Sequence, residues 1–288
     1  MSVFKAAAVQ MRSGTSVERN AAAMEELVRE AAAQGAVYVQ TPEMTGALMR
    51  DREALRASLR DDGHDLIATT AGRLAGELAI HLHVGSTAIA RPDGKVANRA
   101  FLFGPDGRRL AAYDKIHMFD VDLDKGESWR ESATYEPGAA AIVADLPFAR
   151  LGFAICYDLR FPRLFRAEAL AGAEVLTVPA AFTRQTGEAH WHVLLRARAI
   201  ENGAWVIAAA QGGLHEDGRE TYGHSLIVDP WGRVVAEVAG DEPGVIVAEI
   251  DTTASAAARA KVPNLKNARD FEVAMAAAGA EPALRAAS

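Results

Sequence analysis

The sequence predicts an α/β protein built from layers of helices and sheets. Strand and helix patterns alternate between residues 139 and 210, which is typical of a layered α/β architecture. One strand in this region, 204–210, consists of seven apolar residues. Ionisable residues follow several of the apolar strands, and α/β proteins build their sites at such strand ends. A functional site is therefore expected where these strands end.

The N-terminal half is expected to contain five strands and two helical segments. The first helix is amphipathic, with Thr15 as its expected cap, Glu18 three residues later and Gly35 at its end. Turns with the sequence Pro-Asp-Gly, at 92–94 and 105–107, separate the last three strands. The strands are expected over 3–11, 36–40, 81–90, 95–103 and 108–113, and the helices over 16–33 and 51–78, with a break at Gly63.

The C-terminal half begins with a long loop, because residues 114–137 carry many charges and show no clear period. The alanine-rich stretch from residue 273 contains Gly279 and Pro282, which predicts a weakly ordered tail. We therefore expect a single domain over 1–272 and a tail over 273–288. Strands are expected over 139–144, 149–155, 175–179, 204–210, 222–228, 233–239 and 245–250, and helices over 162–171 and 187–202.

The composition is that of an ordinary globular protein, with 288 residues of which 50% are hydrophobic. The net charge of −7 and the scattered basic residues argue against a nucleic-acid partner. A single cysteine excludes an internal disulfide. The first residues lack the apolar region of a signal peptide, and no run approaches the ~20 apolar residues of a membrane span. The sequence predicts a cytoplasmic protein with no membrane partner.

The only cysteine, Cys156, lies where a buried strand runs into a tight loop and Pro162 opens a helix. A lone cysteine is more often a small core residue than a nucleophile. Here, however, Glu43 and Lys115 also follow apolar strands. Amide hydrolysis by a thiol requires a base for the thiol proton and a cation for the oxyanion. We expect Lys115 to lower the pKa of the thiol and Glu43 to raise it.

Three segments resemble the signature segments of the nitrilase superfamily of carbon-nitrogen hydrolases. They are Thr-Pro-Glu at 41–43, Tyr-Asp-Lys-Ile-His-Met-Phe-Asp at 113–120 and Gly-Phe-Ala-Ile-Cys-Tyr-Asp-Leu-Arg-Phe-Pro at 152–162. The resemblance extends from Lys5 to about Asn267 and implies a four-layer α-β-β-α sandwich with a Glu-Lys-Cys triad. It implies that Glu43 is the general base and Cys156 the nucleophile. Lys115 would hold the oxyanion together with the backbone N–H of Tyr157.

The resemblance also suggests further site residues. The segment 129–132 resembles the place of the family's second glutamate, so Glu131 is expected to orient Lys115 or the substrate, with Glu127 as the alternative. Arg160 and Arg184 could each hold a substrate carboxylate, although Arg160 could equally form a structural ion pair. The candidate substrate-binding residues are Tyr157, Arg160, Phe182 and Arg184.

The segments 187–201, 208–211 and 222–225 resemble the Nit branch of the superfamily. The branch implies hydrolysis of a small-molecule amide through a cysteine acyl-enzyme. The first candidate substrate is deaminated glutathione, which would give 2-oxoglutarate and cysteinylglycine. The alternatives are an ω-amidase acting on 2-oxoglutaramate or another small amide, and a non-catalytic binding protein on the same fold. The intact trio of residues disfavours the last. The branch also implies a homodimer or larger homo-oligomer, with helices 162–171 and 187–202 at the subunit contact.

This mechanism needs no metal and no organic cofactor, and none is expected. His81 and His83 share one face of a strand but lack a third ligand at a suitable spacing. His190 and His192 point to different sides of a helix, which disfavours a shared ion. A Cys-His protease with His190 or His224 as base is a weaker alternative, because the local sequence lacks the glycines of a nucleophile elbow.

Overall fold

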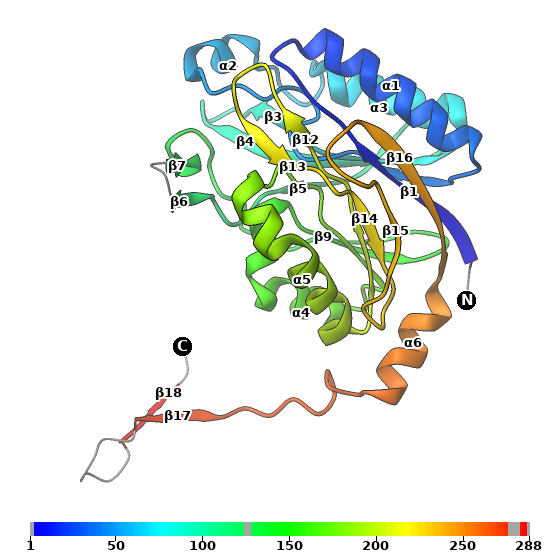
Figure 1. Ribbon diagram of the computed structural model, residues 1–288, viewed down its shortest axis with the longest axis vertical. Coiled ribbons are helices and arrows are strands. Elements are labelled where there is room, and N and C mark those ends of the chain that lie inside the picture. The colour runs from blue at the N-terminus through cyan, green and yellow to red at the C-terminus, as the bar shows by residue number, and fades with distance from the viewer. Residues whose placement is uncertain (1–2, 124–127, 276–282, 287–288) are drawn as a thin grey trace.

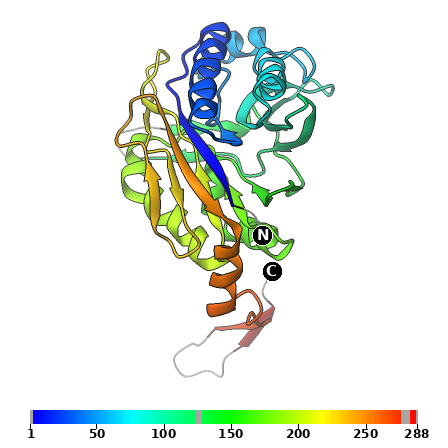
Figure 2. The ribbon, with the colours of Figure 1, turned by 90° about the vertical axis from the view of Figure 1, so that its right-hand side faces the viewer.

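The computed structural model describes residues 3–123, 128–275 and 283–286. Two six-stranded sheets pack face to face, and helices cover their outer faces (Figure 1; Figure 2 shows the layers from the side). The four-layer α-β-β-α sandwich expected from the sequence is confirmed. The largest apolar cluster fills the space between the sheets, and it includes Tyr38 from one sheet and Phe153 from the other.

The first sheet contains the three parallel strands β1, β2 and β3, extended by antiparallel neighbours on both sides. Helices α1 and α3 cover its outer face through apolar residues such as Met24, Val28 and Leu74. In order across the sheet the strands are β16 (Gly244–Asp251), β1 (Val3–Gln10), β2 (Tyr38–Gln40), β3 (His81–Ala90), β4 (Val96–Phe103) and β5 (Arg109–Asp114). The helices of this half are α1 (Val17–Ala33), α2 (Arg52–Ser58) and α3 (Leu66–Leu78).

The second sheet repeats this plan, with β9, β10 and β11 as its parallel strands. In order its strands are β15 (Val234–Glu237), β14 (Leu226–Val228), β11 (Trp205–Ala208), β10 (Val175–Thr177), β9 (Arg150–Phe153) and β8 (Val143–Asp145). The helices of this half are α4 (Pro162–Leu170), α5 (Arg184–Asn202) and α6 (Thr252–Lys261). Small hairpins join β6 (Asp120–Asp122) to β7 (Ser128–Arg130), β12 (Gly212–Leu214) to β13 (Glu220–Tyr222) and β17 (Glu272–Met275) to β18 (Ala283–Ala286).

Several local expectations differ from the structure. The cap of α1 is Ser16, whose hydroxyl accepts a hydrogen bond from Arg19 N, whereas Thr15 turns its hydroxyl to Glu216. The long loop 114–137 contains the β6–β7 hairpin and a 3-10 helix, Glu131–Ala133. The expected break at Gly63 is confirmed, since it separates α2 from α3.

The β17–β18 hairpin lies away from the sandwich in both views (Figure 1, Figure 2). The rest of the expected tail, 276–282 and 287–288, falls outside the described residues, and the division into one domain and a tail stays a prediction. Among the residues that are described, no helix has the length and apolarity needed to cross a membrane.

The two sheets approach each other closely at Gly85, beside a bulge in β3. A Cβ atom at this position would overlap the carbonyl oxygen of Thr41 and the Cβ of Pro179. Only glycine lets these backbones meet here. The contact therefore fixes the start of the loop that carries Glu43 against the second sheet.

Candidate active site

The expected trio of ionisable residues meets at one end of the sandwich. Glu43 follows β2, and Lys115 follows β5, which runs in the same direction as β2 because two antiparallel pairings separate β5 from β3. Cys156 follows β9 of the opposite sheet. Lys115 Nζ lies 2.8 Å from Glu43 Oε1, and the Cys156 thiol faces the Glu43 carboxylate. All three are buried, with exposed fractions of 4%, 2% and 7% for Glu43, Lys115 and Cys156.

Glu131 provides a second carboxylate for the lysine. Its two carboxylate oxygens lie 3.0 and 2.9 Å from Lys115 Nζ, and Oε2 also accepts a hydrogen bond from Phe119 N at 2.7 Å. The alternative, Glu127, lies outside the described residues. In the described part of the chain, Glu131 is thus the second acid that contacts Lys115, beside Glu43.

Asn98 on β4 joins the two carboxylates, and sequence reasoning missed it. Its Nδ2 donates to Glu43 Oε1 at 3.0 Å and to Glu131 Oε1 at 3.1 Å. The stretch 95–103 contains three polar residues, Lys95, Asn98 and Arg99, and nothing in the sequence distinguishes Asn98 among them. Asn98 holds the two acids in a fixed relation to the same ammonium group.

The other oxygen of Glu43 is also held. Glu43 Oε2 accepts a hydrogen bond from Ala181 N at 2.8 Å, which ties the residue to the second sheet. Gln211 Nε2 donates to the Glu43 carbonyl oxygen at 3.0 Å and to Ser13 Oγ at 2.8 Å. The carboxylate thus faces both Lys115 and the thiol with little freedom to rotate.

Cys156 has a left-handed backbone conformation with φ = 50°. This conformation is uncommon for a residue with a side chain and costs about 1–3 kcal/mol, so surrounding contacts must impose it. The backbone N–H of Cys156 donates to Pro179 O at 2.9 Å, and a 3-10 helix, Cys156–Arg160, follows at once. The thiol is therefore presented at a sharp strand-to-helix turn.

Asp158 locks this turn onto the segment that carries Lys115. Its buried carboxylate accepts hydrogen bonds from Ile155 N at 2.9 Å, from the Tyr113 hydroxyl at 2.7 Å and from His117 N at 3.0 Å. Sequence reasoning gave Asp158 no role, because an acid three residues after Ile155 resembles an ordinary loop residue. The structure shows that it joins the Cys156 turn to the segment that carries Lys115.

The electrostatics define the resting protonation of the site. Burial raises the pKa of the Cys156 thiol well above its ordinary value and the charge of Glu43 raises it further, while Lys115 acts in the opposite direction. Burial also raises the pKa of Glu43, but the charge and hydrogen bond of Lys115 outweigh it, so that this pKa is lowered overall. Burial lowers the pKa of Lys115, but Glu131 and Glu43 raise it well above its usual range. The resting site holds a neutral thiol, a carboxylate and an ammonium group.

The trio lies at the wall of a cavity of about 450 Å³. Three of the expected substrate-binding residues, Tyr157, Arg160 and Phe182, also line it. Arg184 lies outside the lining and pairs with Glu220 at 2.6 Å, and with Glu188 and Asp241. These acids neutralise Arg184, so we do not retain it as a substrate residue.

Other arginines face the cavity. The Arg219 guanidinium lies 4.6 Å from the centre of the Trp129 ring, and that of Arg50 lies 5.0 Å from the same ring. Arg219 lies 3.5 Å from its nearest acid, Asp217. Arg160 has no acid within ion-pair distance in the described part of the chain, where its guanidinium contacts His190. The cavity therefore presents positive charge to a ligand, and the sequence gave no signal for Arg50 or Arg219.

The two strand histidines, His81 and His83, are held by packing contacts within the first sheet. His83 is buried and its Nδ1 lies 2.8 Å from the Tyr38 hydroxyl, while burial lowers its pKa to about 3. His81 packs edge-on against the ring of Phe148 at 5.0 Å. Both therefore act as neutral packing residues of the first sheet.

Comparison with known proteins gives consistent matches across the chain. The carbon-nitrogen hydrolase family matches residues 5–260. A Synechocystis protein named deaminated glutathione amidase is 40% identical over 275 residues, covering 93% of this chain and 98% of the relative. A protein of the same name from Yersinia enterocolitica is 39% identical over 269 residues, covering 91% and 92%. Human omega-amidase NIT2 is 34% identical over 269 residues, covering 93% and 96%.

Solved structures agree on the fold. The NitFhit protein of C. elegans superposes with a TM-score of 0.86 at 33% identity, covering 93% of this chain and 65% of that chain. An amidase from Nesterenkonia, described with acrylamide added to its active-site cysteine, superposes with a TM-score of 0.74 at 26% identity, covering 90% and 98%.

Proposed function

The chain belongs to the carbon-nitrogen hydrolase family and is an amide-hydrolysing enzyme, and from this premise we propose that it hydrolyses deaminated glutathione through an acyl-enzyme on Cys156. The observation that carries the proposal is the buried cluster in which Glu43 contacts both the thiol and Lys115, at the wall of an arginine-lined cavity. The products are 2-oxoglutarate and cysteinylglycine.

In the proposed acylation, the sulfur of Cys156 attacks the carbonyl carbon of the amide while Glu43 takes the thiol proton. Negative charge develops on the carbonyl oxygen, where the Lys115 ammonium and the N–H of Tyr157 stabilise it. The proton on Glu43 passes to the amine nitrogen, the C–N bond breaks, and a thioester remains. Because burial and the Glu43 charge raise the pKa of the Cys156 thiol, the attack needs Glu43 to take the thiol proton.

Deacylation uses the same groups. Glu43 takes a proton from water, the resulting hydroxide oxygen attacks the thioester carbon, and Lys115 again faces the oxyanion. The carbon–sulfur bond then breaks, and the thiolate recovers its proton from Glu43. Glu131 supports both steps because it keeps Lys115 charged and in place.

The charge of the cavity supports this substrate. Deaminated glutathione has a carboxylate at each end, whereas 2-oxoglutaramate has one. Three of the five arginines that line the cavity, Arg50, Arg160 and Arg219, could receive two carboxylates, and arginine binds this group in a bidentate manner. The identity to human omega-amidase NIT2 makes 2-oxoglutaramate the second candidate substrate.

A single-turnover experiment tests the proposal. Each of the two substrates is mixed with the intact protein, the reaction is quenched with acid, and the protein mass is measured. We expect the acyl adduct on the wild type, none on Cys156→Ala, and slow formation on Glu43→Gln, with faster product release from deaminated glutathione. Absence of adduct and product with both substrates would favour a non-catalytic binding protein on this fold.

We further propose that the enzyme acts in the cytoplasm as a homodimer or larger homo-oligomer. The exposed apolar side chains of Leu170 on α4 and of Val193 and Ile200 on α5 support a subunit contact on this face. Light scattering coupled to size exclusion measures the oligomer mass, and Val193→Glu should reduce it. Cell fractionation tests the location.

A further inference from the structure

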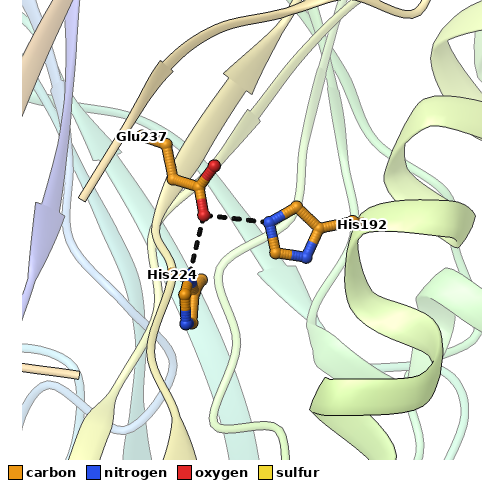
Figure 3. A group of neighbouring side chains, drawn as sticks. All are labelled: His192, His224 and Glu237. Atoms are coloured by element: carbon orange, nitrogen blue, oxygen red, sulfur yellow. Dashed lines mark hydrogen bonds and ion pairs between the residues drawn. The ribbon is translucent and has the colours of Figure 1, made fainter. Parts of the chain in front are cut away.

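The fold brings two histidines and a glutamate together on the surface, away from the proposed active site. Figure 3 shows His192 of α5, His224 after β13 and Glu237 of β15 pointing toward one another. Glu237 Oε1 lies 2.9 Å from His192 Nε2 and 2.7 Å from His224 Nδ1. One nitrogen from each ring and one carboxylate oxygen all lie within 4.8 Å of one another.

We propose that these three side chains form a binding site for a divalent transition-metal ion, with zinc as the ion tested first. Two imidazole nitrogens and one carboxylate oxygen are a donor set that zinc accepts, with water as a fourth ligand. Zinc bonds of about 2.0–2.1 Å in a tetrahedral site separate the ligand atoms by about 3.3 Å. The present separations from Glu237 are smaller by about half an ångström, so small side-chain rotations admit the ion.

The ligands are held in place by contacts outside the cluster. His224 has φ = 55°, its backbone N–H donates to Gly240 O at 2.9 Å, and its carbonyl oxygen accepts the Trp191 indole N–H at 2.8 Å. Its ring stacks on Tyr222 with centres 4.4 Å apart. A ring fixed in this way loses little conformational entropy when it binds an ion.

The site is open to solvent, and one of its three ligands is a carboxylate. The three side chains are 25–31% exposed, so an ion can enter directly. Without an ion, one nitrogen of each ring forms a hydrogen bond with Glu237. When an ion binds, that nitrogen becomes the ligand, and each ring carries its proton on the outer nitrogen. The carboxylate offsets part of the ion's charge.

Metal binding would join a helix to the sheet beneath it. His192 comes from α5, whereas His224 lies just before β14 and Glu237 is the last residue of β15. Trp191, the neighbour of His192, packs on Phe182 of the cavity wall with ring centres 4.9 Å apart. A bound ion is therefore expected to raise the melting temperature of the folded chain.

Isothermal titration of zinc into untagged Cys156→Ala protein tests the site without competition from the thiol. We expect one zinc per chain, at least 10-fold weaker binding in His192→Asn and in His224→Asn, and loss of binding in the double variant. Asparagine also tolerates the left-handed conformation at position 224. Cobalt should give the visible absorption of a tetrahedral site, and this signal should disappear in Glu237→Gln.

His64→Asn is the matched control, because exposed His64 also lies 2.8 Å from a carboxylate, that of Asp61, but belongs to no three-ligand group among the described residues. This variant should bind zinc like its parent. Equal binding in the His192/His224 double variant, or no binding to the parent at micromolar zinc, would overturn the proposal. Circular dichroism of each variant separates loss of the site from loss of the fold. Neither the zinc titration nor the cobalt absorption depends on amidase activity.

Discussion

Glu131 Oε2 lies 2.9 Å from the Nζ of Lys115, so the lysine is shared between this acid and Glu43. Glu131→Gln removes one of the two charges that hold the buried ammonium. We expect kcat to fall by about 10²-fold, because the cation is then drawn toward Glu43 and away from the developing oxyanion. Steady-state kinetics with deaminated glutathione measure this loss.

The control for this variant is Glu136→Gln, five residues away. Glu136 pairs with Lys95 at 2.8 Å, but both side chains are exposed. Surface ion pairs contribute little, so this variant should keep kcat within about twofold of the wild type. An equal kcat in Glu131→Gln and the wild type would show that Lys115 needs only one carboxylate.

The pKa of the Cys156 thiol should fall in Glu43→Gln. Burial and then the Glu43 charge raise this pKa in the wild type, and Lys115 opposes both. Glu43→Gln removes the negative charge that raises the thiol pKa and keeps Lys115, which lowers it. The thiolate should therefore form at lower pH. The ultraviolet absorbance of the thiolate follows this directly because the chain has one cysteine, and Cys156→Ala gives the blank. An unchanged midpoint would mean that Glu43 does not face the thiol in solution.

The central trio could be predicted from sequence because each member follows an apolar strand. The carboxyl ends of strands that run in one direction lie at one edge of a sheet, so β2 and β5 place Glu43 and Lys115 at the same edge of the first sheet. Helix α6, by contrast, was not predicted. Its sequence is mostly alanine and threonine and shows little periodicity, and Asp251 begins it by accepting a hydrogen bond from Thr253 N.

The contacts that hold the trio could not be predicted. The partners of Asn98 lie 55 and 33 residues away in sequence. Asp158 contacts Tyr113, which lies 45 residues away. A polar residue in a strand or loop carries no mark of such a partner. The cluster of His192, His224 and Glu237 could not be predicted for the same reason. Helical spacing shows only that His192 and His190 point to different sides of the helix, and it gives no information on Glu237.

Glu168→Gln should stabilise the protein increasingly as pH rises. Burial of Glu168, together with the nearby charge of Asp158, raises its pKa well above the ordinary value. A raised folded-state pKa means that the folded protein binds this proton more tightly, so stability falls as pH rises above the unfolded pKa of about 4.3. The variant has no proton to lose and avoids this fall.

Urea unfolding at about pH 5 and about pH 8 measures the effect as the free energy of unfolding of the variant minus that of the wild type. This difference should be larger at the higher pH. Glu26→Gln, at an exposed position of α1, should show no such trend. A constant difference for Glu168→Gln would mean that Glu168 titrates normally.

Arg160→Gln and Arg219→Gln should separate the two ends of the substrate. Each loses a cation at the cavity, and hydrogen bonds to charged groups contribute about 1.5–3 kcal/mol, so KM for deaminated glutathione should rise about 10-fold or more in both. For 2-oxoglutaramate, which has one carboxylate, KM should rise in only one of them, and that variant identifies the arginine that binds the acyl end. Arg184→Gln, outside the cavity, should leave both KM values unchanged. If Arg160→Gln and Arg219→Gln both leave KM unchanged while their melting temperatures match the wild type, neither arginine binds a substrate carboxylate.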